Sequence, residues 1–201
     1  MLPKQSVSPK LLELLSFVMK KEEFNDFILV GGTSLALQMN HRISIDIDLF
    51  GKSELDEELF FDILSEFGKT ILLKKSKNIL IFSVDNIKID FVNYRYPLIQ
   101  KPMLKYGFRL ASQMDIAAMK LNAIACRGSK KDFIDLFYLL KKYSLQDMME
   151  FYKQKYQDGS EFMVLKSLTY FDDADKEESP IVFEKVSWET IKTEILSHIK
   201  W

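Results

Sequence analysis

The two halves of the chain differ in how apolar and polar positions alternate. Between residues 27 and 94, short runs of apolar or alternating residues predict strands, because successive strand side chains point to opposite faces. After residue 110, apolar residues recur every three or four positions, which predicts helices that each bury one face. The pattern therefore predicts a mixed α/β half followed by an all-helical half.

The expected elements follow from these patterns together with glycine, proline and capping signals. In the first half we expect helices at 9–21, 33–39 and 56–67, and strands at 27–30, 41–50, 69–75, 79–84 and 87–94. In the second half we expect helices at 111–126, 131–143, 145–156, 161–170 and 188–200, with an acidic loop at 171–180. Two prolines, Pro97 and Pro102, bracket a linker, so we divide the chain into domains at 1–98 and 99–201.

Composition excludes several classes of protein. A net charge of −1 gives no overall field that would draw the protein to nucleic acid or membrane. The single cysteine, Cys126, excludes an internal disulfide and fits a reducing compartment. The N-terminus lacks the basic and apolar segments of a signal peptide, and no apolar run approaches the ~20 residues of a membrane helix. We therefore expect a cytoplasmic protein with no membrane partner.

Two carboxylates stand one residue apart in the apolar stretch that forms the second expected strand. Asp46 and Asp48 project to the same side of a strand, where like charges repel and burial is costly unless something compensates. Asp90 lies among apolar residues in the last expected strand and would join them if the two strands are neighbours. Carboxylates are ligands that Mg²⁺ prefers, so the three acids predict a two-metal Mg²⁺ site. The alternative is an edge strand with a polar, solvent-facing side.

A glycine pair precedes these acids. Gly31 and Gly32 follow an apolar run and lead into a helical segment that begins at Thr33 and Ser34. A strand, a glycine turn and a helix start together aim backbone N–H groups and the positive helix end at an anion. We assign these four residues to the phosphates of a nucleoside triphosphate (NTP). An ordinary turn is the alternative for the glycines alone.

These motifs resemble those of known nucleotidyltransferases. The signature of the polymerase-β-like nucleotidyltransferase superfamily is matched by Val-Gly-Gly at 30–32, Asp-Ile-Asp-Leu at 46–49 and Ile-Asp-Phe at 89–91. Segments 115–121 and 127–136 resemble the AbiEii family of toxins from abortive-infection and toxin–antitoxin systems. The resemblance covers roughly residues 25–143, and it departs from many relatives in having Gly-Gly where they carry Gly-Ser.

The resemblance implies a fold and an activity. The fold would be α+β, with a polymerase-β-like mixed-sheet core at 1–98 and a helical C-terminal domain at 99–201 that completes the active-site cleft. The activity would be transfer of a nucleotide from an NTP, with release of pyrophosphate, to an RNA such as tRNA or to a protein hydroxyl. A cognate antitoxin would be a further partner. The alternatives are a non-catalytic binding protein of the same fold and a small-molecule, antibiotic-type nucleotidyltransferase.

The resemblance also assigns roles in the second half of the chain. Lys120 would be catalytic and would contact the triphosphate, and Asp132 would be catalytic. Lys131 and Asp135 would bind the nucleotide. From the residues alone, a solvated helix lysine is the alternative for Lys120, and the two acids can instead stabilise the first turn of their helix.

Overall fold

The computed structural model describes residues 6–199. Residues 1–5, part of the segment in which we expect no signal peptide, lie outside this range, as do Trp201 and Lys200, the expected end of the last helix. Contacts within the chain define two compact units. The first extends to Arg95 and also contains Pro102–Ala111, and the second contains Tyr96–Lys101 and the chain from Ser112 onward.

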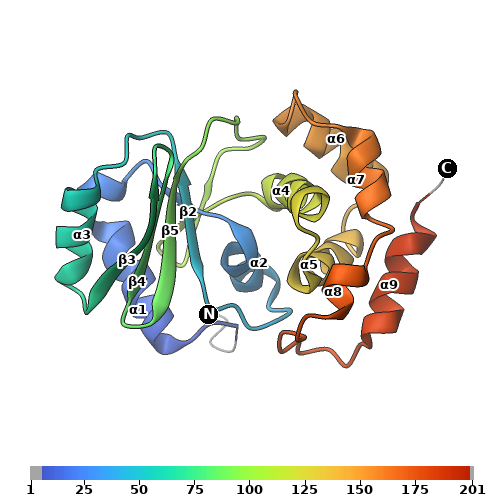
Figure 1. The fold of residues 1–201 in the computed structure, drawn as a ribbon, viewed down its shortest axis with the longest axis horizontal. Coiled ribbons are helices and arrows are strands. Elements are labelled where there is room, and N and C mark those ends of the chain that lie inside the picture. Colours follow the sequence, from blue (N-terminus) through green and yellow to red (C-terminus); the bar gives the residue numbers. More distant parts are fainter. Residues whose placement is uncertain (1–5, 200–201) are drawn as a thin grey trace. The chain divides into compact units, whose positions relative to one another are not determined.

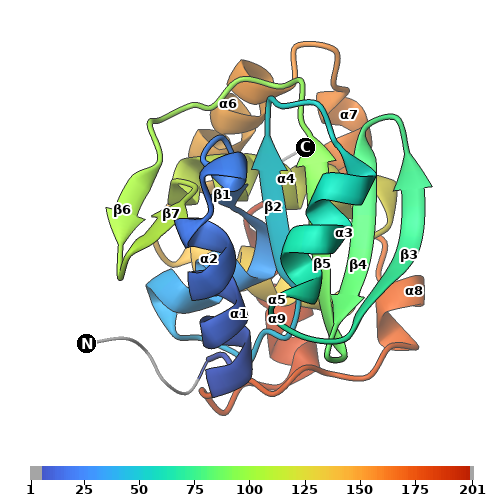
Figure 2. The same ribbon diagram turned by 90° about the vertical axis from the view of Figure 1, so that its left-hand side faces the viewer.

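The described part of the first unit contains a seven-stranded mixed sheet. Its strands are β1 (Ile28–Leu29), β2 (Ile47–Gly51), β3 (Thr70–Ser76), β4 (Ile79–Val84), β5 (Ile87–Asn93), β6 (Met103–Lys105) and β7 (Phe108–Leu110). They lie in the order β3-β4-β5-β2-β1-β7-β6, as Figure 2 shows. The pairs β2–β5 and β1–β7 are parallel and the others are antiparallel. The predicted mixed sheet of an α+β fold is confirmed.

Helices cover both faces of this sheet (Figure 1). α1 (Pro9–Lys20) and α3 (Glu57–Ser65) lie on one face, and α2 (Gly31–Met39) lies on the other. A short 3₁₀ helix, Glu22–Phe24, follows α1, and its Phe24 ring lies 4.9 Å from that of Phe91 in the core. Because strand side chains alternate, the strands that bury Leu49 and Phe91 in this core turn their acidic residues toward the α2 side.

One hairpin was not predicted from the sequence. We expected no strand between residues 99 and 110, yet β6 and β7 form there around Tyr106 and Gly107, both with positive φ. The guanidinium of Arg109 donates hydrogen bonds to three backbone carbonyls of residues 19–27, at 2.8 to 3.0 Å. Strands of three residues carry too little periodicity to be recognised, and the pairing of β7 with β1 joins residues far apart in the sequence. The chain thus returns to the first unit after Pro102, and the division at residue 98 stays a proposal.

The second unit is helical, as predicted. Its helices are α4 (Gln113–Cys126), α5 (Lys130–Leu140), α6 (Leu145–Lys155), α7 (Glu161–Ser167), α8 (Asp172–Asp175) and α9 (Trp188–Ser197). A serine is the N-cap residue of most of these helices, and Ser144 forms a capping box with Asp147 at the start of α6. The short helix α8 lies within the segment that we expected to be a loop. Within residues 6–199, no helix combines the length and the apolar character needed to span a membrane.

A buried ion pair holds the linker to the second unit. Lys155 and Asp115 have fully buried side chains, and their charged groups lie 2.8 Å apart. Asp115 also accepts hydrogen bonds from the backbone N–H groups of Ile99 and Gln100, and Lys155 donates to the carbonyl of Pro97. These bonds satisfy the polar backbone of the linker, so the linker belongs structurally to the helices that follow it.

Candidate active site

Two of the three predicted metal ligands come from strands that lie side by side, while the predicted strand at 41–50 forms only from Ile47 onward. β2 and β5 run parallel, and Asp48 is the direct partner of Asp90 in their register. Asp46 immediately precedes β2. The expectation that these strands are neighbours is therefore confirmed. We call the side of β2 and β5 that carries Asp48 and Asp90 the acid face.

The glycine turn at the start of α2 lies against Asp48. Gly31 has φ +65°, and a Cβ atom at this position would overlap the Asp48 Oδ2 atom. The backbone N–H of Val30 donates to the Asp48 carbonyl at 2.9 Å, which fixes the turn beside the strand. Val30 is the N-cap of α2 and provides no side-chain cap. The first turn of α2 therefore presents backbone N–H groups next to the acid face.

Arg42 is a residue of this site that the sequence interpretation missed. Its side chain is buried, at 3% exposure, and its Nη1 atom donates to the carbonyl of Ile43 at 2.9 Å. A Cβ atom at Gly32 would overlap Arg42 Nη2, so the guanidinium lies directly on the second glycine. A basic residue in the spacer between the glycines and Asp46 was the available signal. A buried guanidinium beside a glycine turn is well suited to bind phosphate oxygens.

The two hydroxyl residues predicted to bind phosphate have partners inside the protein. Thr33 Oγ1 donates to the carbonyl of Asp46 and lies 2.8 Å from Ser44 Oγ. Ser34 Oγ accepts a hydrogen bond from Gln38 Nε2 at 3.1 Å, and both hydroxyl residues are buried. Thr33 therefore couples the helix to the strand that begins after Asp46. A phosphate role for Thr33 and Ser34 stays a prediction, for which their backbone N–H groups are the better placed donors.

Asp90 is paired with a lysine that we had not singled out. Lys88 Nζ lies 2.7 Å from each carboxylate oxygen of Asp90, and its contact to Oδ2 has hydrogen-bond geometry. The two residues are two positions apart on β5 and therefore share a face. The Lys88 ammonium therefore supplies the positive charge that we expected Mg²⁺ to supply.

The acid face has some of the features of a cation site. Asp90 Oδ1 is buried and makes no hydrogen bond, with Lys88 Nζ 2.7 Å away, and the Asp48 carboxylate lies against the backbone of Gly31. Carboxylate oxygens on adjacent strands suit Mg²⁺. Within residues 6–199, however, no group of three acidic, histidine or cysteine side chains is arranged to hold a metal ion. A site built from all three acids therefore requires Asp90 to turn away from Lys88.

The residues that the resemblance assigned in the second unit form a buried charge network. Lys120 Nζ lies 2.9 Å from Asp132 Oδ1 and 2.6 Å from Asp135 Oδ2, and both carboxylates are fully buried. Asp132 also accepts hydrogen bonds from Ser129 Oγ at 2.7 Å and from Arg127 Nε at 2.9 Å. Lys120 is thus enclosed between α4 and α5, and the reading of it as a solvated helix lysine is wrong.

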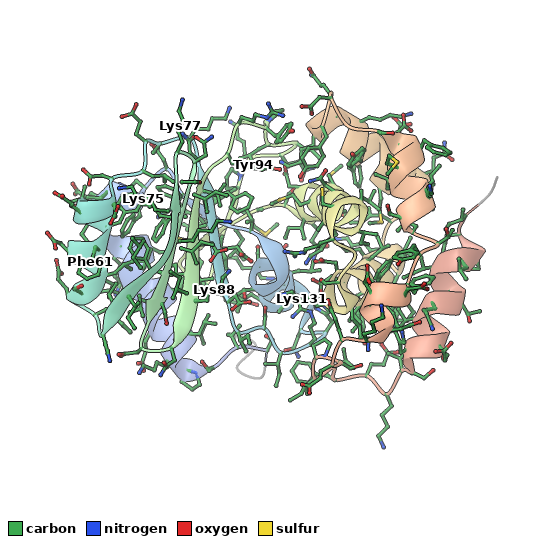
Figure 3. The ribbon with its side chains drawn as sticks, in the orientation of Figure 1. Phe61, Lys75, Lys77, Lys88, Tyr94 and Lys131 are labelled. Atoms are coloured by element: carbon green, nitrogen blue, oxygen red, sulfur yellow. The ribbon has the colours of Figure 1, made fainter. Side chains whose placement is uncertain are left out.

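This network sets the protonation state of Asp132. Burial by itself raises the Asp132 pKa, but the charges and hydrogen bonds of Lys120 and Arg127 outweigh it and hold the pKa well below its usual value. Asp132 is therefore ionised at neutral pH. Lys131, by contrast, is exposed at the start of α5 (Figure 3). The predicted site residues divide between the units, with the glycines and Asp46, Asp48 and Asp90 in the first.

Replacing Gly31 with Ala is expected to impair the site locally. The new Cβ atom would strain a left-handed backbone and displace the Asp48 carboxylate, at a cost of about 1–3 kcal/mol in the free energy of unfolding. Chemical denaturation measures this loss, and the transfer of label from an NTP should fall in parallel. Gly107→Ala is the matched control, because it has φ +82° but no atom within 4 Å of its Cβ position. Equal loss of activity in both variants would contradict a specific role of the contact with Asp48.

Comparisons with known proteins identify the family. Residues 14–199 match the family model described as nucleotidyl transferase AbiEii toxin, type IV toxin–antitoxin system. An uncharacterized protein of Aquifex aeolicus is 39% identical over 176 residues, which cover 84% of each chain.

Two solved structures share the fold. The MenT4 nucleotidyltransferase toxin from Mycobacterium tuberculosis superposes with a TM-score of 0.53 at 16% identity, covering 94% of this chain and 80% of that one. The protein JHP933 from Helicobacter pylori superposes with a TM-score of 0.59 at 15% identity, covering 92% and 85%. Because the family model spans nearly the whole chain, the protein is a nucleotidyltransferase and belongs to the AbiEii toxin family.

Proposed function

We propose that the protein is a Mg²⁺-dependent enzyme that transfers a nucleotide from an NTP to a hydroxyl group of an RNA, such as tRNA, or of a protein. We further propose that it acts in the cytoplasm as the toxin of a toxin–antitoxin or abortive-infection pair and is neutralised by a cognate antitoxin. The observation that supports the chemistry best is the pairing of Asp48 with Asp90 beside the glycine turn of α2. The family supports the role as a toxin.

In the first unit, one group of residues would bind the outer phosphates of the NTP and another would bind the metal ion. The N–H groups at Gly31, Gly32 and the start of α2, with the Arg42 guanidinium, would bind the outer phosphates. Asp46, Asp48 and Asp90 would hold Mg²⁺, which would neutralise the phosphates and acidify the attacking hydroxyl. Through the metal ion, the acids would orient the attacking hydroxyl and the phosphates beside the glycine turn.

In the second unit, we change the roles expected from the resemblance for three of the four residues. The four are Lys120, Lys131, Asp132 and Asp135, and only Lys131 keeps its expected role. Lys120 and both acids already satisfy one another, so we propose that they act mainly by holding α4 and α5 in place. Lys131, which is exposed, remains the proposed direct contact to the nucleotide.

The test is transfer of radiolabel from each of the NTPs into total RNA and into a protein pool. Wild type is expected to label one pool with at least one NTP, and Asp46→Asn to reduce this by about a hundredfold or more. Digestion of the product with ribonuclease or protease identifies the acceptor. Asp62→Asn on α3, an exposed acid on the opposite side of the sheet, serves as the control. Equal labelling by wild type and Asp46→Asn with every NTP would exclude the proposed chemistry.

Lys88 should influence how the site responds to Mg²⁺. In Lys88→Met, Asp90 loses its internal counter-ion, so we expect the metal-free thermal midpoint to fall by a few degrees. Because Mg²⁺ no longer competes with the ammonium, its addition should raise the midpoint more than in wild type. Thermal unfolding of both proteins with and without Mg²⁺ measures the difference. An unchanged response to Mg²⁺ would show that Lys88 does not compete for Asp90.

A further inference from the structure

The acid face continues into a pair of aromatic side chains. Phe50 is the second residue after Asp48 on β2, and Tyr94 directly follows β5, four residues after Asp90. The rings of Phe50 and Tyr94 lie 4.7 Å apart with an interplanar angle of 45°. The Tyr94 N–H donates to the carbonyl of Gly51 at 2.7 Å, so the strand pairing extends to Tyr94. Positions on one face of a strand are about 7 Å apart, which places the first ring one step beyond the acids.

These rings share the acid face because strand residues of equal parity point the same way. Phe50 and Val92 are register partners, as Asp48 and Asp90 are. Both aromatic side chains are partly exposed rather than enclosed in the core. In Figure 3, Tyr94 lies with Lys88 on the α2 side of the sheet, whereas Phe61 and Lys75 lie on the α3 side.

Cationic side chains continue from the aromatic pair across the same part of the sheet. Lys74 is the partner of Ile81, which is the partner of Asp90, so Lys74 belongs to the acid face. Lys77 lies in the β3–β4 turn, which is anchored next to Tyr94 by a hydrogen bond from the Asn93 N–H to the Asn78 carbonyl at 3.0 Å. Both lysines are exposed.

The aromatic pair lies further along β2 and β5 than the acids, whereas the glycine turn lies beside Asp48. The glycine turn follows β1, which pairs with β2 on the side away from β5. The lysines belong to β3 and to the β3–β4 turn, on the far side of β5. A triphosphate bound at the glycine turn therefore leaves the β3–β4–β5 side for the second substrate. Stacking rings next to exposed cations match a single-stranded nucleic acid, whose bases stack and whose phosphates pair with lysine.

We propose, on the basis of the transfer activity proposed above, that Phe50 and Tyr94 stack the terminal base of a single-stranded RNA acceptor. Its phosphates contact Lys74 and Lys77. The terminal ribose hydroxyl attacks the α-phosphorus of the NTP, and a new phosphodiester bond forms. The bond to pyrophosphate breaks, pyrophosphate leaves with its electron pair, and the hydroxyl proton passes to solvent.

Binding of a short dye-labelled single-stranded RNA, followed by fluorescence anisotropy without NTP, tests this site. Tyr94→Leu and Phe50→Leu are expected to weaken binding by about tenfold, because each removes a stacking surface. Tyr94→Phe keeps the ring and should bind like wild type. Lys74→Gln should weaken binding and reduce its dependence on salt concentration, because one phosphate contact is lost.

The matched controls come from the opposite side of the sheet. Lys75 is the neighbour of Lys74 but pairs with Glu57 on α3, and Phe61 is exposed on the same helix. Lys75→Gln and Phe61→Leu should bind RNA like wild type. Binding of a fluorescent NTP analogue should be unchanged in all these variants, and thermal unfolding verifies that each remains folded. If Phe50→Leu unfolds, the comparison of Tyr94→Leu with Tyr94→Phe decides alone.

The outcomes separate this inference from the proposed activity. If Tyr94→Leu binds RNA as well as wild type, or if wild type binds no RNA, the inference is overturned. If wild type labels protein and Tyr94→Leu labels it equally well, the transfer activity stands and the RNA site does not. If Tyr94→Leu loses RNA binding but wild type transfers no nucleotide to any acceptor, the RNA site stands and the proposed activity fails.

Discussion

Replacing Lys120 with Met is expected to lower the free energy of unfolding of the second unit by about 3–5 kcal/mol. The substitution preserves most of the side-chain volume but removes the ammonium that lies between Asp132 and Asp135. Two fully buried carboxylates would then face each other without their shared positive charge, and burying charge without compensation is costly. Both tryptophans, Trp188 and Trp201, lie in the second half of the sequence, so tryptophan fluorescence during chemical denaturation reports this loss.

Lys131→Met is the control for this stability measurement. Lys131 is exposed and only 11 positions away in the sequence, so its loss should change the free energy of unfolding by less than about 1 kcal/mol. The double variant Lys120→Met with Asp135→Asn should recover part of the stability, because it removes one of the two buried charges that Lys120 neutralises. Equal destabilisation by Lys120→Met and Lys131→Met would show that the buried network does not stabilise the helices.

The same network predicts how the free energy of unfolding changes with pH. Because the Asp132 pKa is lower in the folded protein than in the unfolded chain, Asp132 stabilises the fold above the unfolded value of about 3.9. This contribution is lost as the pH falls from there toward the lower folded value. In Lys120→Met the folded pKa of Asp132 should rise, so the loss of stability in acid should become shallower. Denaturation curves between neutral and acidic pH measure both slopes.

The double variant Asp48→Asn with Asp90→Asn is expected to lose nucleotide transfer by about a thousandfold or more. These residues are direct partners across β2 and β5, so the substitutions remove the negative charge that we propose holds Mg²⁺. The fold should persist, because replacing adjacent like charges with amides removes repulsion and offsets the loss of the Lys88–Asp90 ion pair. Without metal, the thermal midpoint should stay within a few degrees of that of wild type, and Mg²⁺ should no longer raise it.

Asp62→Asn controls for the removal of a carboxylate elsewhere in the first unit. It should retain both transfer and the rise in midpoint with Mg²⁺, because Asp62 lies on α3 and on the other side of the sheet. Retention of the Mg²⁺ response in the Asp48 and Asp90 double variant would place the metal elsewhere. Retention of full transfer would show that the acid face is not the reactive centre.

The local sequence pattern was sufficient to predict most helices and strands and the residues of the acid face. Alternation along the strands dictates that Asp48 and Asp90 leave the core when Leu49 and Phe91 enter it. The helical repeat after residue 110 predicted the all-helical half, and the glycines predicted the turn with which α2 begins. These features depend on residues only a few positions apart, so they can be recognised in the sequence itself.

Pairing between distant segments was decided only by the tertiary structure. β6 and β7 are short and gain their place from the pairing of Leu29 with Leu110 and from the bonds of Arg109 to the segment after α1. The position of Arg42 on Gly32 likewise depends on how the spacer folds back on α2. Neither contact has a periodic signature.

The sequence by itself determined that this chain has a strand–glycine–helix turn, two acids on strands with a third just before one of them, and a set of charged residues in the helical half. The partners of those charges were decided by the tertiary structure. Lys88 neutralises Asp90, and Lys120 is buried against Asp132 and Asp135. A lysine has the same helix and strand periodicity whether it contacts a phosphate, a carboxylate or water. Only the positions of the neighbouring groups, and the burial that makes their pairing necessary, distinguish these roles.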